Sequence, residues 1–430
     1  MPAPSSNTAA NGLPKHRTSQ AGNVAGGVAG GVAGGGQARP KVLLLVETTM
    51  AFGRSVLEGI SRYRIERQPW SVQLDLRELM AGPPAWFRSW DGDGIITRDT
   101  TPEMIEIIRE TGIPTVNLGD IRDDQSLPSV INDHEAIGRL AASHLADKGI
   151  EHFAFAGFSD HHWSSQRLTG FLAGLAERGV EDPERVHVHQ SGWSSASQGG
   201  WQQQQDQIVA WVKSLPRPIG ILACNDFRGQ HILEACQTAK VSVPDEIAVL
   251  GVDNDHVLCD FCDPPLSSII PAAERIGYQA AVMLDQMMRG QTPDQPHVQI
   301  APLGIAERLS TDVMAIDDED VAAAIQMIRF RACEGLTVSD ILAEVPIARS
   351  SLERRFRQYL GRSPQAEIRR VQIKRACQLL RDTELSLVKI SRLTGFKHAE
   401  YFSVVFKREV NQTPGRYRDA SRAKARKPFG

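Results

Sequence analysis

Side chains suited to binding a sugar follow short apolar segments in the first three quarters of the chain. Asn225 and Asp226 come directly after one such segment, and Asp253 comes after the next. Carboxylate and amide groups bind pairs of neighbouring sugar hydroxyls, and Arg167 could hold a ring oxygen or an anomeric hydroxyl. Phe52 and Trp163 could supply an apolar platform for the C–H face of a sugar ring. These residue types point to a binding site for a small sugar.

Each of these residues also has a purely structural explanation. The aspartates that end strands could cap the following helices, and the arginine could form a structural ion pair. The two aromatic rings could belong to the core. Asp133 heads a predicted helix, and we interpret it as the cap of that helix rather than as a ligand.

A second set of side chains lies on two predicted helices near the C-terminal end and suits contact with DNA. The first helix exposes Arg349, Ser350, Glu353, Arg354 and Arg357, and the second exposes Lys397, His398, Glu400, Tyr401, Ser403 and Lys407. Arginine pairs with guanine and glutamate with the N4 amino group of cytosine, whereas lysine and serine more often hold phosphates. The two helices are therefore candidates for insertion into the major groove.

Both helices belong to an internal repeat with a period of 50 residues. Six pairs of residues correspond at this offset: Leu352 and Phe402, Phe356 and Phe406, Arg357 and Lys407, Gly361 and Asn411, Ser363 and Thr413, and Pro364 and Pro414. In each unit an apolar pair four residues apart fixes one helix face to a core and leaves the opposite, polar face exposed. Gly361 and Asn411 suit left-handed helix caps, and the prolines follow where a helix must end. The repeat predicts two helix-turn-helix units that would enter successive major grooves.

The distribution of charge supports a DNA-binding module. The net charge of −3 hides two halves of opposite sign. From Asp320 to Gly430 the chain carries 23 Lys and Arg against 11 Asp and Glu, a net of +12, whereas the first 319 residues carry a net of −15. A compact basic block on an acidic chain is typical of a module that binds a polyanion.

The elements that must position the sugar-binding side chains alternate between strands and helices. We expect strands at 42–46, 72–76, 94–96, 115–118, 153–156, 219–223 and 248–252, and helices at 54–64, 102–110, 135–148, 167–178, 202–214, 229–239 and 272–289. This alternation favours parallel sheets joined by helical crossovers. Two sheets, over about 41–140 and 141–270, would flank a cleft, and ligands of such sheets bind at the carboxyl ends of the strands.

The helical region resembles a known DNA-binding family. Leu385–Arg418 contains Ile390, Gly395-Phe396, Tyr401-Phe402-Ser403, Phe406-Lys407 and Thr413-Pro414-x-x-Tyr417-Arg418. These motifs resemble the AraC-type DNA-binding domain. The chain departs from the family pattern at Pro346, where glycine is usual, and at Ala348 and His398, where a helix-capping serine is common.

The preceding region is similar to the LacI and periplasmic sugar-binding class. The resemblance rests on Asp133, on Arg167 three residues before Gly170-Phe171, on Cys224-Asn225-Asp226, and on Gly251-Val252-Asp253-Asn254-Asp255. LacI-type regulators carry their DNA-binding unit at the N-terminus, whereas here it follows Glu307–Asp312 at the C-terminal end. This order resembles the family of xylose operon regulatory proteins over most of the chain.

The resemblance implies a fold and a set of partners. The fold is a two-lobed α/β domain of the LacI type followed by an all-α AraC-type domain with two helix-turn-helix units. The implied effector is D-xylose or a related sugar, and no cofactor is implied. The implied activity is activation of transcription from a double-stranded DNA operator, with RNA polymerase as a further partner and a homodimer as the assembly.

Composition sets the expected boundaries and location. We expect a disordered tail over 1–39, a sugar-sensing domain over 40–312, a linker over 313–320, a DNA-binding domain over 321–422 and a basic tail over 423–430. The first segment is rich in Ala, Gly and Ser and cannot bury enough apolar surface to fold. Because no run approaches the roughly 18 apolar residues of a membrane span and glycine interrupts the N-terminal segment, we expect a soluble, cytoplasmic protein without a signal peptide.

Other functions remain as alternatives. An enzyme acting on a small sugar in the same cleft is disfavoured, since the sequence has no Walker loop, nucleophile elbow or paired metal ligands. Cys259 and Cys262 lack the further ligands that a zinc site requires, so we interpret them as two thiols in a turn. A transport-linked binding protein is disfavoured by the basic helical module. A repressor that responds to a different small molecule stays open.

Overall fold

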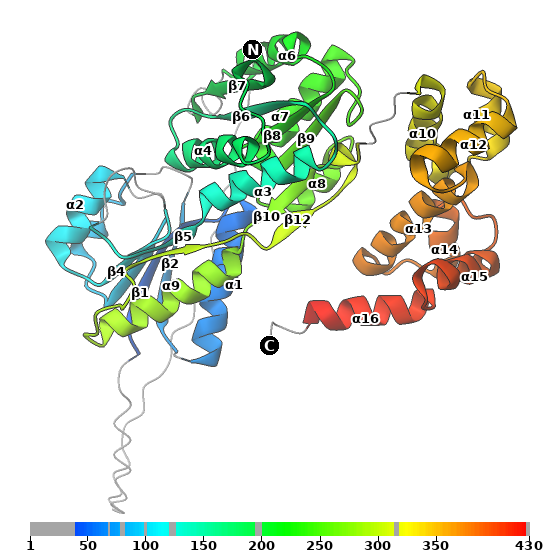
Figure 1. Cartoon of the computed structure of the whole chain (residues 1–430). Helices are drawn as coiled ribbons and strands as arrows, with labels where there is room; N and C mark the ends of the chain where they lie inside the picture. Colours follow the sequence, from blue (N-terminus) through cyan, green and yellow to red (C-terminus); the bar gives the residue numbers. More distant parts are fainter. Residues whose placement is uncertain are drawn as a thin grey trace, which may run out of the picture.

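The chain folds into two α/β lobes followed by a helical module (Figure 1). The computed structural model describes residues 39–67, 69–77, 82–98, 101–119, 126–193, 200–313 and 318–426. Residues 1–38 of the predicted tail, 314–317 of the predicted linker and 427–430 of the basic tail lie outside the described residues. Within the described ranges, every helix is too short or too polar to cross a lipid bilayer.

The first lobe is built on a six-stranded parallel sheet in the order β11-β5-β4-β3-β1-β2. Its strands are β1 (Lys41–Glu47), β2 (Ser71–Arg77), β3 (Gly94–Thr97), β4 (Thr115–Asn117), β5 (Ser129–Asn132) and β11 (His297–Ile300). The helices α1 (Ala51–Glu66), α2 (Pro102–Thr111) and α9 (Ala273–Met288) cover the sheet. The central strands are apolar on both faces, as expected for a parallel sheet that is covered on both sides.

The second lobe has a sheet in the order β12-β10-β9-β8-β6-β7, parallel except for the last pairing, β10 with β12. Its strands are β6 (His152–Phe158), β7 (Val186–Ser191), β8 (Ile219–Ala223), β9 (Ile247–Val252), β10 (Ser267–Ile270) and β12 (Gly304–Ala306). Its helices are α3 (His134–Ala146), α4 (His162–Ala176), α6 (Trp201–Ser214), α7 (Asp226–Ala239) and α8 (His256–Phe261).

The two lobes are interleaved along the chain, so the predicted division into 41–140 and 141–270 is wrong. The chain crosses between the lobes after β5, after β10 and after β11. As a result α3 packs in the second lobe, while α9 and β11 return to the first. The apolar face of α9 indicates that the helix packs against a sheet, but nothing local in the sequence indicates which of the two sheets it covers.

Two glycines bring α3 and α4 into direct backbone contact. A Cβ atom on Gly138 would lie 2.3 Å from the carbonyl oxygen of Arg167, and one on Gly170 would lie 2.1 Å from that of Glu135. Any larger residue would push the helices apart. This close approach fixes Arg167, which lies in the middle of α4 because the helix begins at His162 rather than at the predicted start.

The helical module contains two cores joined by one long helix. It consists of α10 (Glu319–Arg331), α11 (Val338–Glu344), α12 (Arg349–Leu360), α13 (Pro364–Asp382), α14 (Leu387–Leu393), α15 (Ala399–Val410) and α16 (Pro414–Arg426). Leu352 and Phe356 are buried in the first core, and Phe402 and Phe406 are buried in the second. Leu393, at the end of α14, is 43% exposed and lies outside both cores.

The helix ends of the module confirm the predicted caps. Gly361 ends α12 with φ +65° and Asn411 ends α15 with φ +58°, both in the left-handed region. Pro364 and Pro414 then open α13 and α16. At the start of α12 and α15, neither Ala348 nor His398 provides a side-chain cap, as their residue types imply.

The two units of the module meet at Gly395, which has φ +77°. Its Cβ position lies 2.7 Å from the carbonyl oxygen of Ala332 and 2.9 Å from Nε2 of Gln372. The buried Gln372 amide donates to that same carbonyl over 2.8 Å. Only a glycine therefore allows the turn of the second unit to pack against the first.

We predict that Gly395→Ala destabilises the module by about 2–3 kcal/mol, because a left-handed backbone and a steric clash add together. Gly361→Ala is the matched control, since that glycine has φ +65° but nothing lies within 4 Å of its Cβ position. The control should cost only about 1 kcal/mol. Chemical denaturation measures both, and equal losses would show that the contact between the units contributes nothing.

Candidate functional site

A cleft opens between the lobes at the carboxyl ends of their strands. The residues that line it come from both lobes and from the first crossover: Met50, Phe52, Arg98, Leu118, Gly119, Asn132, His134, Trp163, Arg167, Trp193, Asn225 and Asp253. Five of the six residues predicted from the sequence therefore line one cleft, and Asp226 does not. The lining combines three aromatic side chains, an imidazole, two guanidinium groups, two amides and a carboxylate.

Arg167 is the most connected group of the cleft. Its side chain is 4% exposed, and Nη2 lies 3.6 Å from Oδ1 of Asp253. Nη1 donates to the carbonyl oxygen of Cys224, and Nε donates to Nδ1 of His134 over 3.3 Å. The guanidinium carbon lies 4.9 Å from the centre of the Trp163 ring. These contacts join the first crossover to the carboxyl ends of β8 and β9.

Burial shifts the pKa values of these groups in opposite directions. Burial lowers the pKa of the Arg167 guanidinium and raises that of the Asp253 carboxyl, and the attraction between the two opposes both shifts. Burial, together with the charges of Arg167 and Arg98, also holds the pKa of His134 well below its usual value. The His134 ring is therefore neutral and can accept the hydrogen bond from Arg167.

The first lobe contributes a second guanidinium and an unpaired acceptor. Arg98 pairs with the buried Glu47, and its guanidinium carbon lies 4.4 Å from the centre of the Phe52 ring. Asn132, at the end of β5, is 5% exposed, and its Oδ1 atom has no hydrogen-bond partner within the described part of the chain. Buried acceptors are nearly always paired, so this atom is available to accept a hydrogen bond from a molecule in the cleft.

An aromatic wall closes the side of the cleft formed by the second lobe. Trp193 packs against Phe158 with ring centroids 4.8 Å apart, and Trp163 lies edge-on to His161 at 5.4 Å. The carboxylate of Asp160 accepts from the backbone N–H of Trp193 over 2.8 Å and so fixes this residue. Two indole rings thus offer apolar surface beside the polar groups.

Asn225 and Asp226 differ in role although they are adjacent. Asn225 lines the cleft and caps α7, since its Oδ1 accepts from the backbone N–H of Arg228 over 2.9 Å. Asp226 lies in the first turn of α7, which begins earlier than predicted, and its carboxylate is buried away from the cleft. It accepts from Ser268 Oγ over 2.6 Å and from the backbone N–H of Asp255 over 2.7 Å. Asp226, predicted as a ligand-binding residue, is thus not among the residues that line the cleft, and its carboxylate supports the loop that carries Asp253.

The pKa of Asp226 makes the stability of the folded chain depend on pH. Burial, assisted by the negative charge of Asp253, raises the pKa of Asp226 to about 8. An unfolded aspartate has a pKa of about 4, so folding favours the protonated form. This contribution to stability is fully present below pH ~4 and is lost as the pH rises through ~8.

We predict that Asp226→Asn, which mimics the protonated carboxyl, flattens the fall in melting temperature between pH 5 and pH 9. Relative to wild type, the variant should gain about 3 °C or more at the alkaline end, as expected for roughly 1 kcal/mol in a domain of this size. Asp91→Asn, at a side chain that is 85% exposed, is the control. If the melting temperatures of wild type and Asp226→Asn change with pH in the same way, the raised pKa of Asp226 is contradicted.

Several residues of the cleft are missing from the sequence-based set. Arg98 follows β3 and Asn132 ends β5, so both obey the rule that ligands bind at the carboxyl ends of strands. The strand before Arg98 is predicted and would have led to it, whereas β5 has only four residues and escapes the pattern. His134 and Trp193 lie in helix starts or loops, where sequence gives no comparable signal.

The cysteine pair near the cleft packs as ordinary apolar residues. Cys259 and Cys262 have free thiols and belong to the core of the second lobe. In the part of the chain that the structure describes, no group of three or more His, Cys, Asp and Glu side chains is arranged to hold a metal ion.

The second candidate surface is the exposed face of α12 and the turn before it. Arg349, Ser350, Arg354 and Arg357 are exposed, while Glu353 is half-buried and lies 3.7 Å from Arg349. The apolar positions of the helix face inward. The outward face is therefore strongly cationic, as contact with DNA requires.

The matching surface of the second unit lies on α15. Lys397, His398, Glu400, Tyr401 and Lys407 are exposed, and Ser403 is half-buried, with its hydroxyl donating to the carbonyl oxygen of Ala399 over 2.9 Å. Tyr401 accepts a hydrogen bond from Arg369 of α13 over 2.6 Å.

The sequence-based set of DNA-contacting residues omits one apolar side chain. Val404 is 67% exposed on α15, on the helix that carries the predicted base contacts. An exposed apolar side chain on such a helix suits the methyl group of thymine. Valine is typical of core positions, so its residue type does not indicate that it is exposed.

Comparisons with known proteins agree with this architecture. The periplasmic binding protein-like domain family matches residues 142–311, and the helix-turn-helix domain family matches residues 330–420. A solved structure of the xylose-binding transcription activator xylR is 29% identical, covers 89% of this chain and 98% of that chain, and superposes with a TM-score of 0.74. The transcriptional regulator CelR in complex with cellobiose shares the fold of the lobes, at 20% identity and a TM-score of 0.52 over 63% of this chain and 85% of that chain.

Relatives of similar length share the whole arrangement. The xylose operon regulatory proteins of Haemophilus influenzae and Escherichia coli K12 are each 31% identical to this chain, cover 88% and 89% of it, and are themselves covered to 98%. The predicted fold, a LacI-type α/β domain followed by an AraC-type module, is confirmed. The chain belongs to the family of xylose operon regulatory proteins, a family of DNA-binding transcription regulators rather than enzymes.

Proposed function

We propose that the cleft binds D-xylose or a closely related sugar and that the bound sugar promotes activation of transcription by this chain. The observation that carries the proposal is the unpaired, buried Oδ1 of Asn132, which lines the same cleft as Arg167 and Asp253. A sugar hydroxyl would donate to this acceptor while others bind the carboxylate and the guanidinium. Trp163 and Trp193 supply surface for the C–H face of the ring. The names of the relatives supply the identity of the sugar.

The cleft supports a change of state because its polar groups come from both lobes. Asp253 and Arg167 belong to the second lobe, Asn132 to the first, and Arg54 of the first lobe lies 3.6 Å from Asp255 of the second. A ligand that contacts both lobes binds their closed arrangement more tightly than any open one and shifts the population toward it. The sugar thereby acts on the regulator without a chemical reaction.

On the DNA side, we propose that α12 and α15 enter successive major grooves of an operator. Arg349, Ser350, Glu353, Arg354 and Arg357 form the first contact set, and Lys397, His398, Glu400, Tyr401, Ser403, Val404 and Lys407 form the second. Activation then requires that the bound module also contact RNA polymerase, which an in vitro transcription assay with purified polymerase tests directly.

We predict that D-xylose raises the affinity of the chain for its operator by about 5-fold or more, the usual size of a binding linkage. Fluorescence anisotropy on a duplex selected by the chain from a randomised library measures this affinity, with L-arabinose as the matched control pentose.

Asp253→Asn should weaken sugar binding by about 10-fold, because a charge-assisted hydrogen bond is lost.

Arg354→Ala should weaken operator binding by about 10-fold at any sugar concentration, since a good base contact is worth roughly 1–3 kcal/mol. Arg289→Ala, at an exposed arginine of the first lobe, is the control.

The effector is tested separately. If D-xylose changes neither the operator affinity nor the rate of transcription, the proposed effector is wrong. If D-xylose makes the chain repress transcription instead of activating it, the proposed sugar site is unaffected but the proposed sign of regulation is wrong.

We also propose that the chain forms a homodimer through a groove between α1, α8 and α9. Val257, which lines this groove, is 66% exposed on α8, and two further apolar side chains outside its lining are exposed on the same helices, Phe261 (86%) on α8 and Ile65 (83%) on α1. The groove between these helices also carries arginines and glutamates in nearly equal number. Apolar side chains among charges of both signs suit contact with an identical surface related by a two-fold axis.

We predict that Phe261→Asp converts the dimer into a monomer at micromolar concentration, because an unpaired charge would be buried at the contact. Sedimentation velocity measures the mass. Phe330→Asp is the matched control, since Phe330 is 56% exposed on α10 of the helical module. A wild-type monomer, or a Phe261→Asp dimer, would rule out this interface.

A further inference from the structure

The loop after β9 holds an unusual backbone conformation beside the cleft. Asp253 and Asn254 have φ values of +108° and +48°, in a region that side chains other than glycine rarely occupy. Three consecutive N–H groups hold the loop: Asp253 donates to the carbonyl oxygen of Ile269, Asn254 to Ser268 Oγ and Asp255 to Asp226. A strained loop persists only where its surroundings fix it, and this one carries a carboxylate that lines the cleft.

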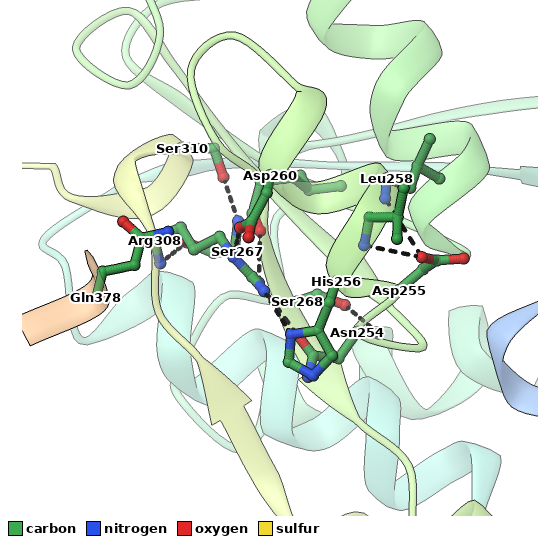
Figure 2. A network of polar contacts seen from close by, with 12 residues as sticks. Asn254, Asp255, His256, Leu258, Asp260, Ser267, Ser268, Arg308, Ser310 and Gln378 are labelled. Carbon is green, nitrogen blue, oxygen red and sulfur yellow. Dashed lines mark hydrogen bonds and ion pairs between the residues drawn. The ribbon is translucent and has the colours of Figure 1, made fainter. Parts of the chain in front are cut away.

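Arg308 contacts this loop from the segment between β12 and the helical module. Its Nη1 donates to Asn254 Oδ1 over 3.1 Å and to the carbonyl oxygen of Leu266 over 3.0 Å. Its Nε donates to Asp260 over 3.0 Å, and Nη2 lies 3.5 Å from Nδ1 of His256. Figure 2 shows the Arg308 side chain reaching toward Asn254, His256 and Asp260. One guanidinium therefore links both ends of the loop and the helix α8 that follows it.

The segment that carries Arg308 is itself fixed to the second sheet. The backbone N–H of Arg308 donates to Ser267 Oγ over 2.8 Å. Ser310 Oγ donates to the carbonyl oxygen of Val249 over 2.6 Å, and Thr311 Oγ1 donates to Ser267 Oγ over 2.8 Å. These hydrogen bonds couple the segment that carries Arg308 to β9 and β10, so the segment links the loop that Arg308 contacts to the rest of the second sheet.

The same segment is in contact with the DNA-binding module. Arg329 of α10 donates to the carbonyl oxygen of Asp312, and Arg370 of α13 lies 3.7 Å from the Asp312 carboxylate. Arg329 also lies 2.7 Å from Asp245, to which Gln326 donates over 2.9 Å. Gln378 of α13 belongs to the network drawn around Arg308 (Figure 2). A continuous set of contacts thus runs from the cleft through Arg308 to α10 and α13.

We propose that Arg308 is the positioning residue that transmits occupancy of the cleft to the DNA-binding module. The inference rests on the proposed function, in which a sugar binds Asp253 and closes the lobes. When a bound sugar displaces the Asp253 carboxylate, the loop after β9 and the start of α8 move with it. Arg308 follows, because its guanidinium group contacts Asn254 and His256. Its own segment then changes the position of α10 and α13 relative to the sheet.

Two variants test this role without touching the cleft lining. Arg308→Lys keeps the positive charge but loses the several N–H donors of the planar guanidinium group. Asn254→Gly removes the side-chain oxygen that accepts from Arg308, and glycine tolerates the positive φ at this position. In both, we expect the dissociation constant for D-xylose by calorimetry to stay within about 3-fold of wild type, and the melting temperature to stay within a few degrees. The ratio of operator affinities with and without D-xylose should fall from about 5-fold or more to nearly 1.

Combining the two substitutions should cause no further loss, because both remove the same interaction. Arg217→Lys, at a surface ion pair with Glu246 in the same lobe, should keep the wild-type ratio. A wild-type ratio in Arg308→Lys and Asn254→Gly would overturn the role of Arg308 while leaving the proposed function intact. Equal losses of sugar binding and stability in both variants would also overturn it, in favour of a purely structural contact. A wild-type ratio of 1 would instead overturn the proposed function, and this inference with it.

Discussion

The burial of one charge, that of Arg167, organises the sensing domain. Removing a guanidinium from water costs several kcal/mol unless every donor finds an acceptor, so the surrounding structure must supply acceptors from fixed positions. It does so from three places that are distant in sequence: His134 at the first crossover, Cys224 at the end of β8 and Asp253 at the end of β9. Gly138 and Gly170 allow the two helices to approach closely enough for these distances to be met.

Much of this arrangement could be predicted from residue types and spacing. The strands around Val42–Val46 and Ile219–Ala223 are continuous apolar runs, and the 50-residue repeat identifies both recognition helices with their apolar pairs and left-handed caps. The five predicted residues that line one cleft are polar groups after strands, aromatic rings or, for Arg167, a guanidinium. Local chemistry determines these features, so a local pattern is enough to find them.

The remaining features depend on contacts between distant segments. Short strands such as β5 and β12, with four and three residues, depend on pairing with neighbouring strands, and they are too short to show a clear period in the sequence. The return of α9 to the first lobe depends on Gly59 of α1 and Gly277 of α9, which let the backbones of the two helices come into direct contact. The burial of Asp226 could not be predicted, because a carboxylate after a strand looks the same in sequence whether it faces a ligand or, as here, a serine of β10.

The attachment of α10 to the second lobe limits how this regulator can be divided. Because Arg329 and Gln326 bind Asp245, and Asp312 binds the module in turn, the boundary between sensing and DNA binding is not the short connection that separates them in sequence. The second lobe and the helical module are joined by side-chain contacts as well as by the chain itself. A chimaera that grafts a foreign sensor onto this module would have to retain the turn around Asp245 and the segment 307–312. Transplanting the module alone would sever the contacts through which the two halves communicate.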